Sequence, residues 1–213
     1  EGVIGVGKTT VTRLLSEAMG GETLFEIVEE NPFLKDFYQD RDAWALQLET
    51  FFLLNRIKQL EDTGRKLAAG TTIVSDYNIL KNRIFAGLTL SGTKREKYLQ
   101  VYSVLTGDLP KADLVLYLHA DHSAVMERIA RRDRPFERNM DPHYIMGLAD
   151  EYQRYFQDVP AYLGDTRVLT VDTTELDLVS SEADKAHLID LVKGALQQRR
   201  DSVVPILESA HSA

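Results

Sequence analysis

A chain of 213 residues with a net charge of −8 is long enough to bury the core of one sizeable α/β domain. Its acidity argues against a nucleic-acid polymer or an anionic membrane as the main partner. The absence of Cys excludes disulfides, thiolate metal sites and thiol catalysis. No apolar run reaches transmembrane length and no signal peptide is visible, so we expect a cytoplasmic protein.

The first residues fit the phosphate-binding loop pattern of Gly, four residues and Gly-Lys-Ser/Thr, formed here by Gly2, Val3, Ile4, Gly5, Val6, Gly7, Lys8 and Thr9, with Thr10 next. Glycines let backbone N–H groups turn towards a phosphate chain at a helix N-terminus. Lys8 then neutralises the β/γ oxygens, and the Thr9 hydroxyl ligates Mg²⁺. Helically spaced apolar residues follow at once, so a glycine turn without a ligand is the minor alternative. Such a loop normally follows a buried strand, and we expect that strand to be missing before Glu1.

The remaining elements alternate along the chain. We expect short strands at 23–28, 71–75, 113–118 and 168–172, and a short helix or loop at 33–40. Helices are expected at 42–67, 78–88, 93–106, 122–132, 142–160 and 182–198, with a frayed tail from about 199. This alternation predicts an α/β fold with a parallel sheet of about five strands flanked by helices. Ligands bind at the carboxyl ends of such strands, where Glu29, Glu30 and Asp76 fall.

Two groups of residues indicate what happens to the nucleotide. Glu30 follows a strand and precedes the helix breaker Pro32, so it can accept the proton of an attacking hydroxyl, or it can be a helix cap or surface charge. Glu49, Phe52 and Arg56 share one face of the helix 42–67. This face can line a base-binding pocket, although spacing alone slightly favours a solvated stripe.

A third group is an arginine cluster at the end of the helix 122–132, formed by Arg128, Arg131, Arg132 and Arg134, with Glu137 beyond. Arginines there can simply complement the helix dipole. A lid that clamps phosphoryl oxygens is the favoured interpretation, because the phosphate loop supplies the anion. The five His lack metal-ligand spacing, and we interpret them as structural or surface residues.

In this order the motifs resemble the deoxynucleoside kinases, most closely the bacterial deoxyguanosine/deoxyadenosine kinases, over nearly the whole chain. The segments that carry the resemblance are 1–10 as phosphate loop, 27–32 around the general base, 44–56 as base-recognition helix, 128–137 as lid, and 172–177 beside the ATP adenine. The resemblance implies a P-loop kinase fold with an Arg-rich lid, one domain over 1–213, ATP as donor, Mg²⁺ at Thr9 and Asp76, and a homodimer formed by paired helices.

The resemblance also assigns residues to roles. Catalysis falls to Glu30, Lys8, Asp76, Arg128, Arg132 and Arg134. ATP contacts the loop from Gly2 to Thr10, Arg132, and Asp172, Glu175 and Leu176. The deoxynucleoside contacts Glu30, Tyr38, Glu49, Phe52, Arg56, Asp76, Tyr77, Asn82, Glu137 and Tyr144.

Three departures from the family pattern bear on the substrate. Glu49 stands where the family often has Gln, and Asn82 stands in the place of a base-contacting Asp. The triplet from Asp76 to Asn78 replaces an acidic-Arg-Ser triplet, so the usual arginine near the 5′-hydroxyl is absent. An ionised Glu49 accepts from guanine N1–H and its 2-amino group but faces an acceptor at adenine N1, while Arg56 and Asn82 can donate to O6 or N7.

We therefore predict deoxyguanosine over deoxyadenosine, with Glu49→Gln relaxing the preference. A deoxyadenosine or broader deoxynucleoside kinase is the nearest alternative. A nucleoside-monophosphate kinase would need additional basic residues in its acceptor pocket, because its acceptor carries a phosphate. The carboxylates of Glu29, Glu30 and Glu49 argue against that function. A nucleotide switch would need a guanine-reading Asn-Lys-x-Asp-type loop, which the segment 168–177 lacks.

Overall fold

The structure, a computed structural model, describes residues 1–28, 31–134, 137–138, 140–158, 162–164 and 166–201. Its elements in chain order are α1 Lys8–Met19, β1 Glu22–Leu24, α2 Leu34–Gln39, α3 Arg41–Ala68, β2 Ile73–Ser75, α4 Lys81–Thr89, α5 Gly92–Leu105, β3 Leu114–His119, α6 His122–Arg132, α7 Pro142–Gln157, β4 Arg167–Asp172 and α9 Glu182–Asp201. The predicted alternation of strands and helices is confirmed, within a few residues at most ends.

The strands form two parallel pairs. β1 pairs with β2, with Glu22 opposite Ile73, and β3 pairs with β4, with Leu114 opposite Arg167. The expectation of about five strands is corrected to four among the described residues. Glu1 lies beside β3, where its main-chain nitrogen donates to the Leu116 carbonyl (2.7 Å) and its carbonyl accepts from the Leu118 N–H (2.8 Å).

The strand expected over 23–28 ends at Leu24. The chain leaves the ladder because side chains, not a neighbouring strand, take its next backbone groups. The Glu26 N–H donates to Asp76 Oδ1 (2.9 Å), and the Phe25 carbonyl accepts from the Gln59 side chain (2.9 Å). The segment after β1 is thereby tied to the carboxyl end of β2.

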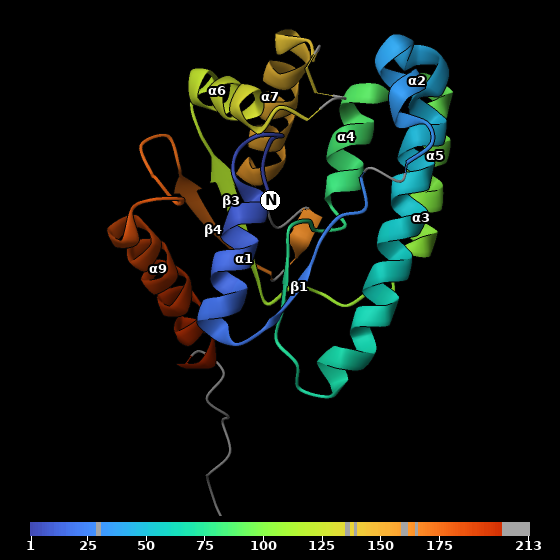
Figure 1. Ribbon diagram of the computed structural model, residues 1–213. Helices are drawn as coiled ribbons and strands as arrows, with labels where there is room; N and C mark the ends of the chain where they lie inside the picture. The colour runs from blue at the N-terminus through green and yellow to red at the C-terminus, as the bar shows by residue number, and fades with distance from the viewer. Residues whose placement is uncertain (29–30, 135–136, 139, 159–161, 165, 202–213) are drawn as a thin grey trace, which may run out of the picture.

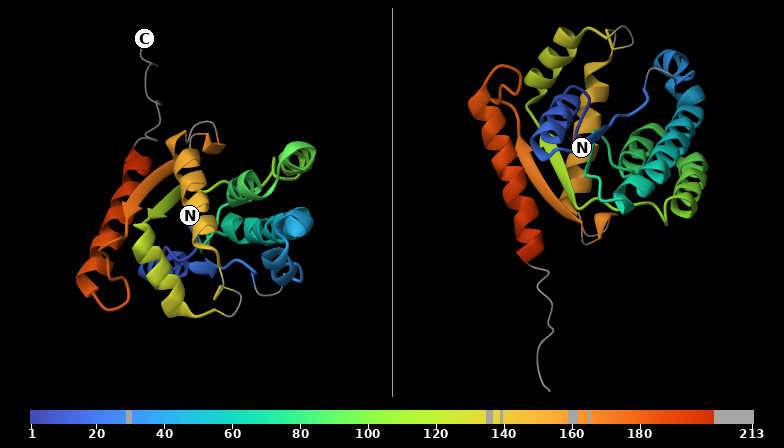
Figure 2. Two further views of the ribbon diagram at one scale, coloured as in Figure 1. Left: turned by 90° about the horizontal axis from the view of Figure 1, so that it is seen from above. Right: turned by 60° about the horizontal axis from the view of Figure 1, so that its bottom comes forward.

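Helices cover the strands on both sides (Figure 1). α1 contacts β1 and β2, and α9 contacts α1 and β3. α4 packs between α3 and α7, and α3 also contacts α2 and α5. The views in Figure 2 show α9 on the side of the molecule opposite α3 and α5. Among the described helices none is long and apolar enough to cross a membrane.

The core lies between these layers and fixes α7 against β3. Tyr117 of β3 stacks on Phe156 of α7 with ring centroids 4.2 Å apart, and Tyr152 continues the stack. Tyr152 is fully buried, and its hydroxyl donates to a carboxylate oxygen of Glu1 (2.8 Å). The same carboxylate accepts from the Asn78 N–H. The core thus joins the start of the phosphate loop to the turn after β2.

Candidate active site

The segment from Gly2 to Thr9 forms a tight loop that opens α1. Gly2, Gly5 and Gly7 have φ values of 144°, 88° and 109°, a region that L side chains rarely adopt. A Cβ on Gly5 would also lie 2.6 Å from Ile129 Cγ1. The first turn of α1 contains no acidic residue, so its N-terminal end offers backbone donors to an anion without a competing carboxylate.

Lys8 lies inside this loop. Its ammonium donates to the carbonyl oxygens of Gly2 (2.7 Å) and Val3 (2.9 Å). Burial and then the positive charge of Lys81 lower the pKa of Lys8 to about 7. A buried cation is stabilised when an anionic ligand binds beside it. This fits the role that the phosphate-loop motif predicts for Lys8.

Thr9 and Asp76 meet at the carboxyl end of β2. The Thr9 hydroxyl lies 3.3 Å from Asp76 Oδ2, while Asp76 Oδ1 accepts the Glu26 N–H. One hydroxyl and one carboxylate suit Mg²⁺, which takes few protein ligands and completes its shell with waters and phosphate oxygens. No cluster of three or more His, Cys, Asp or Glu able to hold a metal occurs in the described part of the chain.

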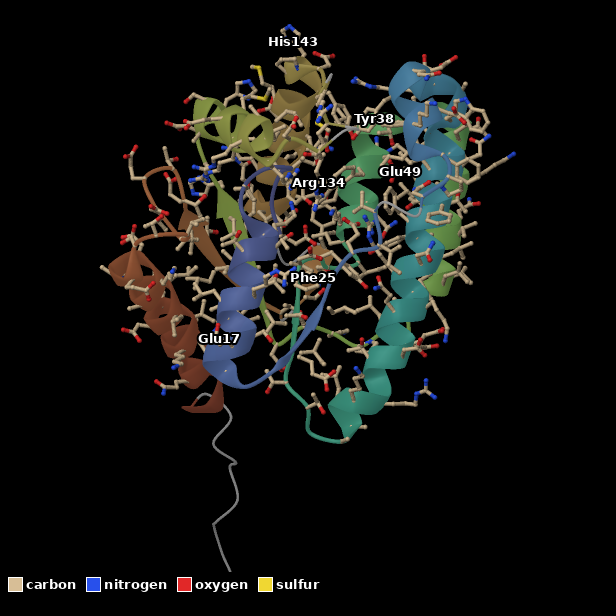
Figure 3. All side chains as sticks on the ribbon, in the orientation of Figure 1. Glu17, Phe25, Tyr38, Glu49, Arg134 and His143 are labelled. Carbon is tan, nitrogen blue, oxygen red and sulfur yellow. The ribbon has the colours of Figure 1, made fainter. Side chains whose placement is uncertain are left out.

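A cavity of about 840 Å³ opens above the loop. Its wall comes from the phosphate loop, the segment after β1, α2, α3, α4, the end of α6 and the loop after β4. In Figure 3, Arg134 and Tyr38 lie in the upper half of the molecule and Phe25 lies below them. These three residues come from different parts of the chain, and all of them line this cavity. A single cavity therefore joins the phosphate loop to the face of α3 that carries Phe52 and Arg56.

Glu26, which was not predicted as a site residue from the sequence, lines this cavity. Its carboxylate accepts from Arg56, with Nε 2.8 Å from Oε1, and from the Lys81 ammonium. Burial alone would raise the pKa of Glu26, but Arg56 and Lys81 lower it to about 2. Glu26 had been placed inside a strand, and its partners lie 30 and 55 residues away. The available signal was a lone acid between apolar residues just before the carboxyl end of a predicted strand.

Behind the cavity wall, α3, α4 and α5 enclose a polar cluster. The Asn82 side-chain N–H donates to the Tyr98 hydroxyl (2.9 Å), which donates in turn to the Glu49 carbonyl (3.4 Å). This order presents Asn82 Oδ1 as an acceptor, not the donor predicted from sequence. Neither this atom nor Arg56 Nη1 has a hydrogen-bond partner among the described residues. A buried acceptor and a buried donor without partners point to a polar ligand.

Glu49 belongs to the same cluster. It is 1% exposed and accepts from the Thr89 hydroxyl (2.9 Å). Burial raises the pKa of Glu49 to about 7, against the opposing effects of Thr89 and Arg56. The solvated-stripe interpretation is therefore wrong, because Glu49 and Arg56 are both buried. The assumption of a fully ionised Glu49 also needs correction, since near neutral pH both forms are populated.

The arginine cluster lines the cavity opposite α3, through Arg128, Arg131, Arg132 and Arg134. Arg128 donates to the Thr173 hydroxyl (3.0 Å), which joins the end of α6 to the loop after β4. Arg132 Nε donates to Glu137 (3.0 Å). Glu137 also acts on Tyr38, whose pKa is raised by burial and then by this carboxylate. Arg132, Glu137 and Tyr38 thus gather at one rim of the cavity.

The structure brings together many of the residues expected from the sequence. The cavity is lined by Ile4, Gly5, Val6, Gly7, Lys8, Thr9, Thr10, Tyr38, Phe52, Arg56, Asp76, Arg128, Arg132, Arg134, Glu137 and Leu176. The expected residues absent from that lining are Gly2, Val3, Glu49, Tyr77, Asn82, Tyr144, Asp172 and Glu175. Asp172 instead accepts hydrogen bonds from Thr174. Glu30 lies outside the described residues.

Comparisons with known proteins agree with this arrangement. The family model described as "Deoxynucleoside kinase" matches residues 1–197. The chain is 41% identical to a deoxyguanosine kinase of Bacillus subtilis, over 90% of this chain and 95% of that protein. It is 27% identical to a deoxyadenosine/deoxycytidine kinase of the same organism, over 93% and 92%. A structure of deoxyadenosine kinase from M. mycoides with bound dCTP superposes with a TM-score of 0.75 at 26% identity, covering 92% of this chain and 96% of that one.

Proposed function

The chain belongs to the deoxynucleoside kinase family and is a phosphotransferase with the P-loop kinase fold, and from this premise we propose that it transfers the γ-phosphoryl group of ATP to the 5′-hydroxyl of a purine deoxynucleoside, with deoxyguanosine preferred. The observation that carries the proposal is the single cavity that joins the phosphate loop and Asp76 to Arg56 and Phe52. A phosphate donor and a nucleoside acceptor can meet there.

The transfer needs a group that takes the hydroxyl proton. Glu26 lines the cavity, and its main-chain N–H is bonded to the candidate metal ligand Asp76, so we assign this role to the Glu26 carboxylate. Glu30, the candidate from sequence, remains the alternative. The acceptor oxygen attacks the γ-phosphorus, and the charge that develops on the transferring group is stabilised by Lys8 and by the lid arginines Arg128, Arg132 and Arg134. The product is the deoxynucleoside monophosphate.

Mg²⁺ is the cofactor that the donor requires. Thr9 and Asp76 would hold it, and when bound it would neutralise charge on the β- and γ-phosphate oxygens. The adjacent hydroxyl and carboxylate, 3.3 Å apart, support this assignment. We also expect the enzyme to act in the cytoplasm, in purine salvage, as a homodimer.

The base preference is supported by the unpaired atoms of the polar cluster. Arg56 Nη1, on the cavity wall, offers a donor for guanine O6. Behind that wall, the unpaired Asn82 Oδ1 and the Glu49 carboxylate, which also accepts from Thr89, offer acceptors for guanine N1–H and the 2-amino group,. The Arg56 guanidinium lies 5.0 Å from the centroid of the Phe52 ring, so one wall carries both an aromatic face and a donor. A site built in this way rejects a base that leaves its buried groups unpaired.

The test is phosphoryl transfer from Mg·ATP to deoxyguanosine, deoxyadenosine, deoxycytidine and thymidine as separate acceptors, with the product identified by mass. We expect deoxyguanosine to have the largest kcat/KM. A larger value for deoxyadenosine would refute the base assignment and leave the kinase. Hydrolysis of ATP that no nucleoside accelerates would favour the nucleotide switch, and transfer to a nucleoside monophosphate alone would favour that class of kinase.

Paired variants separate the two candidate proton acceptors. Glu26→Gln removes the carboxylate but keeps a side chain that can accept from Arg56. We expect it to lower kcat by about 10²–10⁴-fold, while Glu30→Gln retains activity within a few-fold. The opposite ranking would return the role to Glu30.

A further inference from the structure

Lys81 is a buried lysine to which the sequence analysis assigned no role. It is the first residue of α4, is 5% exposed and lines the cavity. A buried ammonium is costly unless a charged or polar partner compensates for its lost hydration. Its partner is the carboxylate of Glu26, so Lys81 is held at the wall where the acceptor hydroxyl is expected.

Several buried charged side chains meet around Glu26. One carboxylate is shared by two buried cations, Arg56 and Lys81. Lys8 is close enough to Lys81 that their like charges repel. Asp76, on this part of the wall, and the buried Glu1 are the other carboxylates that act on Lys8. The Lys8 and Lys81 ammonium groups therefore repel each other where Glu26 and the phosphate loop meet, and a further anion between them would relieve that repulsion,.

We propose that Lys81 is a catalytic residue of the phosphoryl transfer, whose ammonium contacts the transferring phosphoryl group from the acceptor side while it holds the Glu26 carboxylate in place. The inference rests on the proposed transfer to a nucleoside hydroxyl. In that step the hydroxyl oxygen bonds to the γ-phosphorus, the bond to the β,γ-bridging oxygen breaks with its electron pair leaving on ADP, and the hydroxyl proton passes to Glu26. Lys81 stays protonated throughout.

A merely structural role for Lys81 would be to neutralise Glu26. Arg56 already does so, because its Nε lies 2.8 Å from Glu26 Oε1 and a second guanidinium nitrogen contacts the same oxygen. The Lys81 ammonium contacts the other oxygen, Oε2. The second cation thus adds positive charge at the cavity wall, beside an ion pair that is already formed. Charge placed in this way stabilises a transition state that carries more negative charge on its phosphoryl oxygens and attacking oxygen.

The first test compares Lys81→Met and Lys81→Arg in the full chain with Lys97→Met, a control at an exposed position on α5. Thermal unfolding first establishes that each variant is folded. We expect Lys81→Met to lower kcat by about 10²-fold with the KM for the nucleoside changed only a few-fold, Lys81→Arg to recover part of the loss, and Lys97→Met to match the wild type. Lys81→Met with an unchanged kcat would overturn the proposal. An equal loss of kcat in Lys81→Arg and Lys81→Met would also overturn it, because arginine keeps the positive charge that methionine removes.

A second measurement needs no turnover. The probe is Mg·ADP with aluminium fluoride and the accepted nucleoside, which imitates the transferring group, and its affinity is compared with that for Mg·ATP alone. We expect Lys81→Met to weaken the first by about 10²-fold and the second only a few-fold. Equal weakening of both would contradict a contact specific to the transition state. If another nucleoside replaces deoxyguanosine as best substrate, both tests are run with that nucleoside, so failure of the base assignment is told apart from failure of the Lys81 proposal.

Discussion

The preference for deoxyguanosine over deoxyadenosine should depend on pH, because it is attributed to a carboxyl group that titrates near neutrality. Burial raises the pKa of Glu49 to about 7. The charged groups that act on it are Arg56 and Lys81, which favour the ionised form, and Glu26, which opposes it. The ionised form accepts from guanine, while the protonated form can donate to adenine N1. Raising the pH should therefore favour deoxyguanosine.

The magnitude follows from the fraction of Glu49 that is ionised. With a pKa of about 7, that fraction rises about tenfold between pH 6 and pH 8. The ratio of kcat/KM for deoxyguanosine to that for deoxyadenosine should rise at least in proportion. The quantity to measure is kcat/KM and not kcat, because the pH dependence of kcat/KM reports the pKa of groups in the unbound enzyme.

The assay is a set of initial rates for both nucleosides across this pH range, in the wild type, Glu49→Gln and Glu61→Gln. Glu61 lies on the same helix and is exposed, so its variant controls for the loss of one charge on α3. The ratio should be independent of pH only in Glu49→Gln. A wild-type ratio that does not change with pH, or one that falls as pH rises, would refute the assignment of base reading to Glu49.

Four other outcomes are expected. Because the folded-state pKa of Glu49 lies above its ordinary value of 4.5, the wild type should lose about 3 kcal/mol of stability as pH rises from about 4.5 to 7, and Glu49→Gln should lose less in urea unfolding. Asp76→Asn should raise the Mg²⁺ concentration needed for half-maximal activity about tenfold or more; an unchanged requirement would exclude Asp76 as a ligand. Gly5→Ala should lower the free energy of unfolding by about 1–3 kcal/mol, because the added Cβ would clash with Ile129. A variant as stable as the wild type would contradict this close contact between the loop and α6. Tyr98→Phe frees the Asn82 amide to rotate and should reduce the preference for deoxyguanosine over deoxyadenosine, measured as the same kcat/KM ratio.

The parts of the fold that follow from local sequence were predicted well. The glycines at 2, 5 and 7 need positive φ values, and a helix begins at Lys8 as the motif requires. α6 begins and ends where the apolar spacing and the terminal arginines indicate. These features depend on backbone sterics and helical period, which a single sequence shows directly.

Features that depend on contacts between distant residues were not predicted. Residues 23–28 were expected to form one short strand, but Asp76 and Gln59 take the backbone groups after Leu24. The role of Glu26 comes from Arg56 and Lys81, on two other elements. The sequence offered no basic residue for this wall in the triplet at 76–78, whereas the structure brings Lys81 there from the start of α4.

The orientation of polar side chains was the other limit. Helical spacing correctly placed Glu49, Phe52 and Arg56 near one another, yet only Phe52 and Arg56 line the cavity. The hydroxyl of Tyr98, on a third helix, decides which end of the Asn82 amide is left unpaired. Burial of Glu49, which sets its pKa, depends on how three helices pack and has no local signature.

The central claim is tested most directly by competition. Equal concentrations of the four deoxynucleosides are incubated with limiting Mg·ATP at pH 8, and the products are separated and identified as 5′-monophosphates. We predict that deoxyguanosine monophosphate dominates from the start of the reaction, with ADP formed in an amount equal to the sum of the monophosphates. Formation of ADP without any nucleoside monophosphate would contradict it.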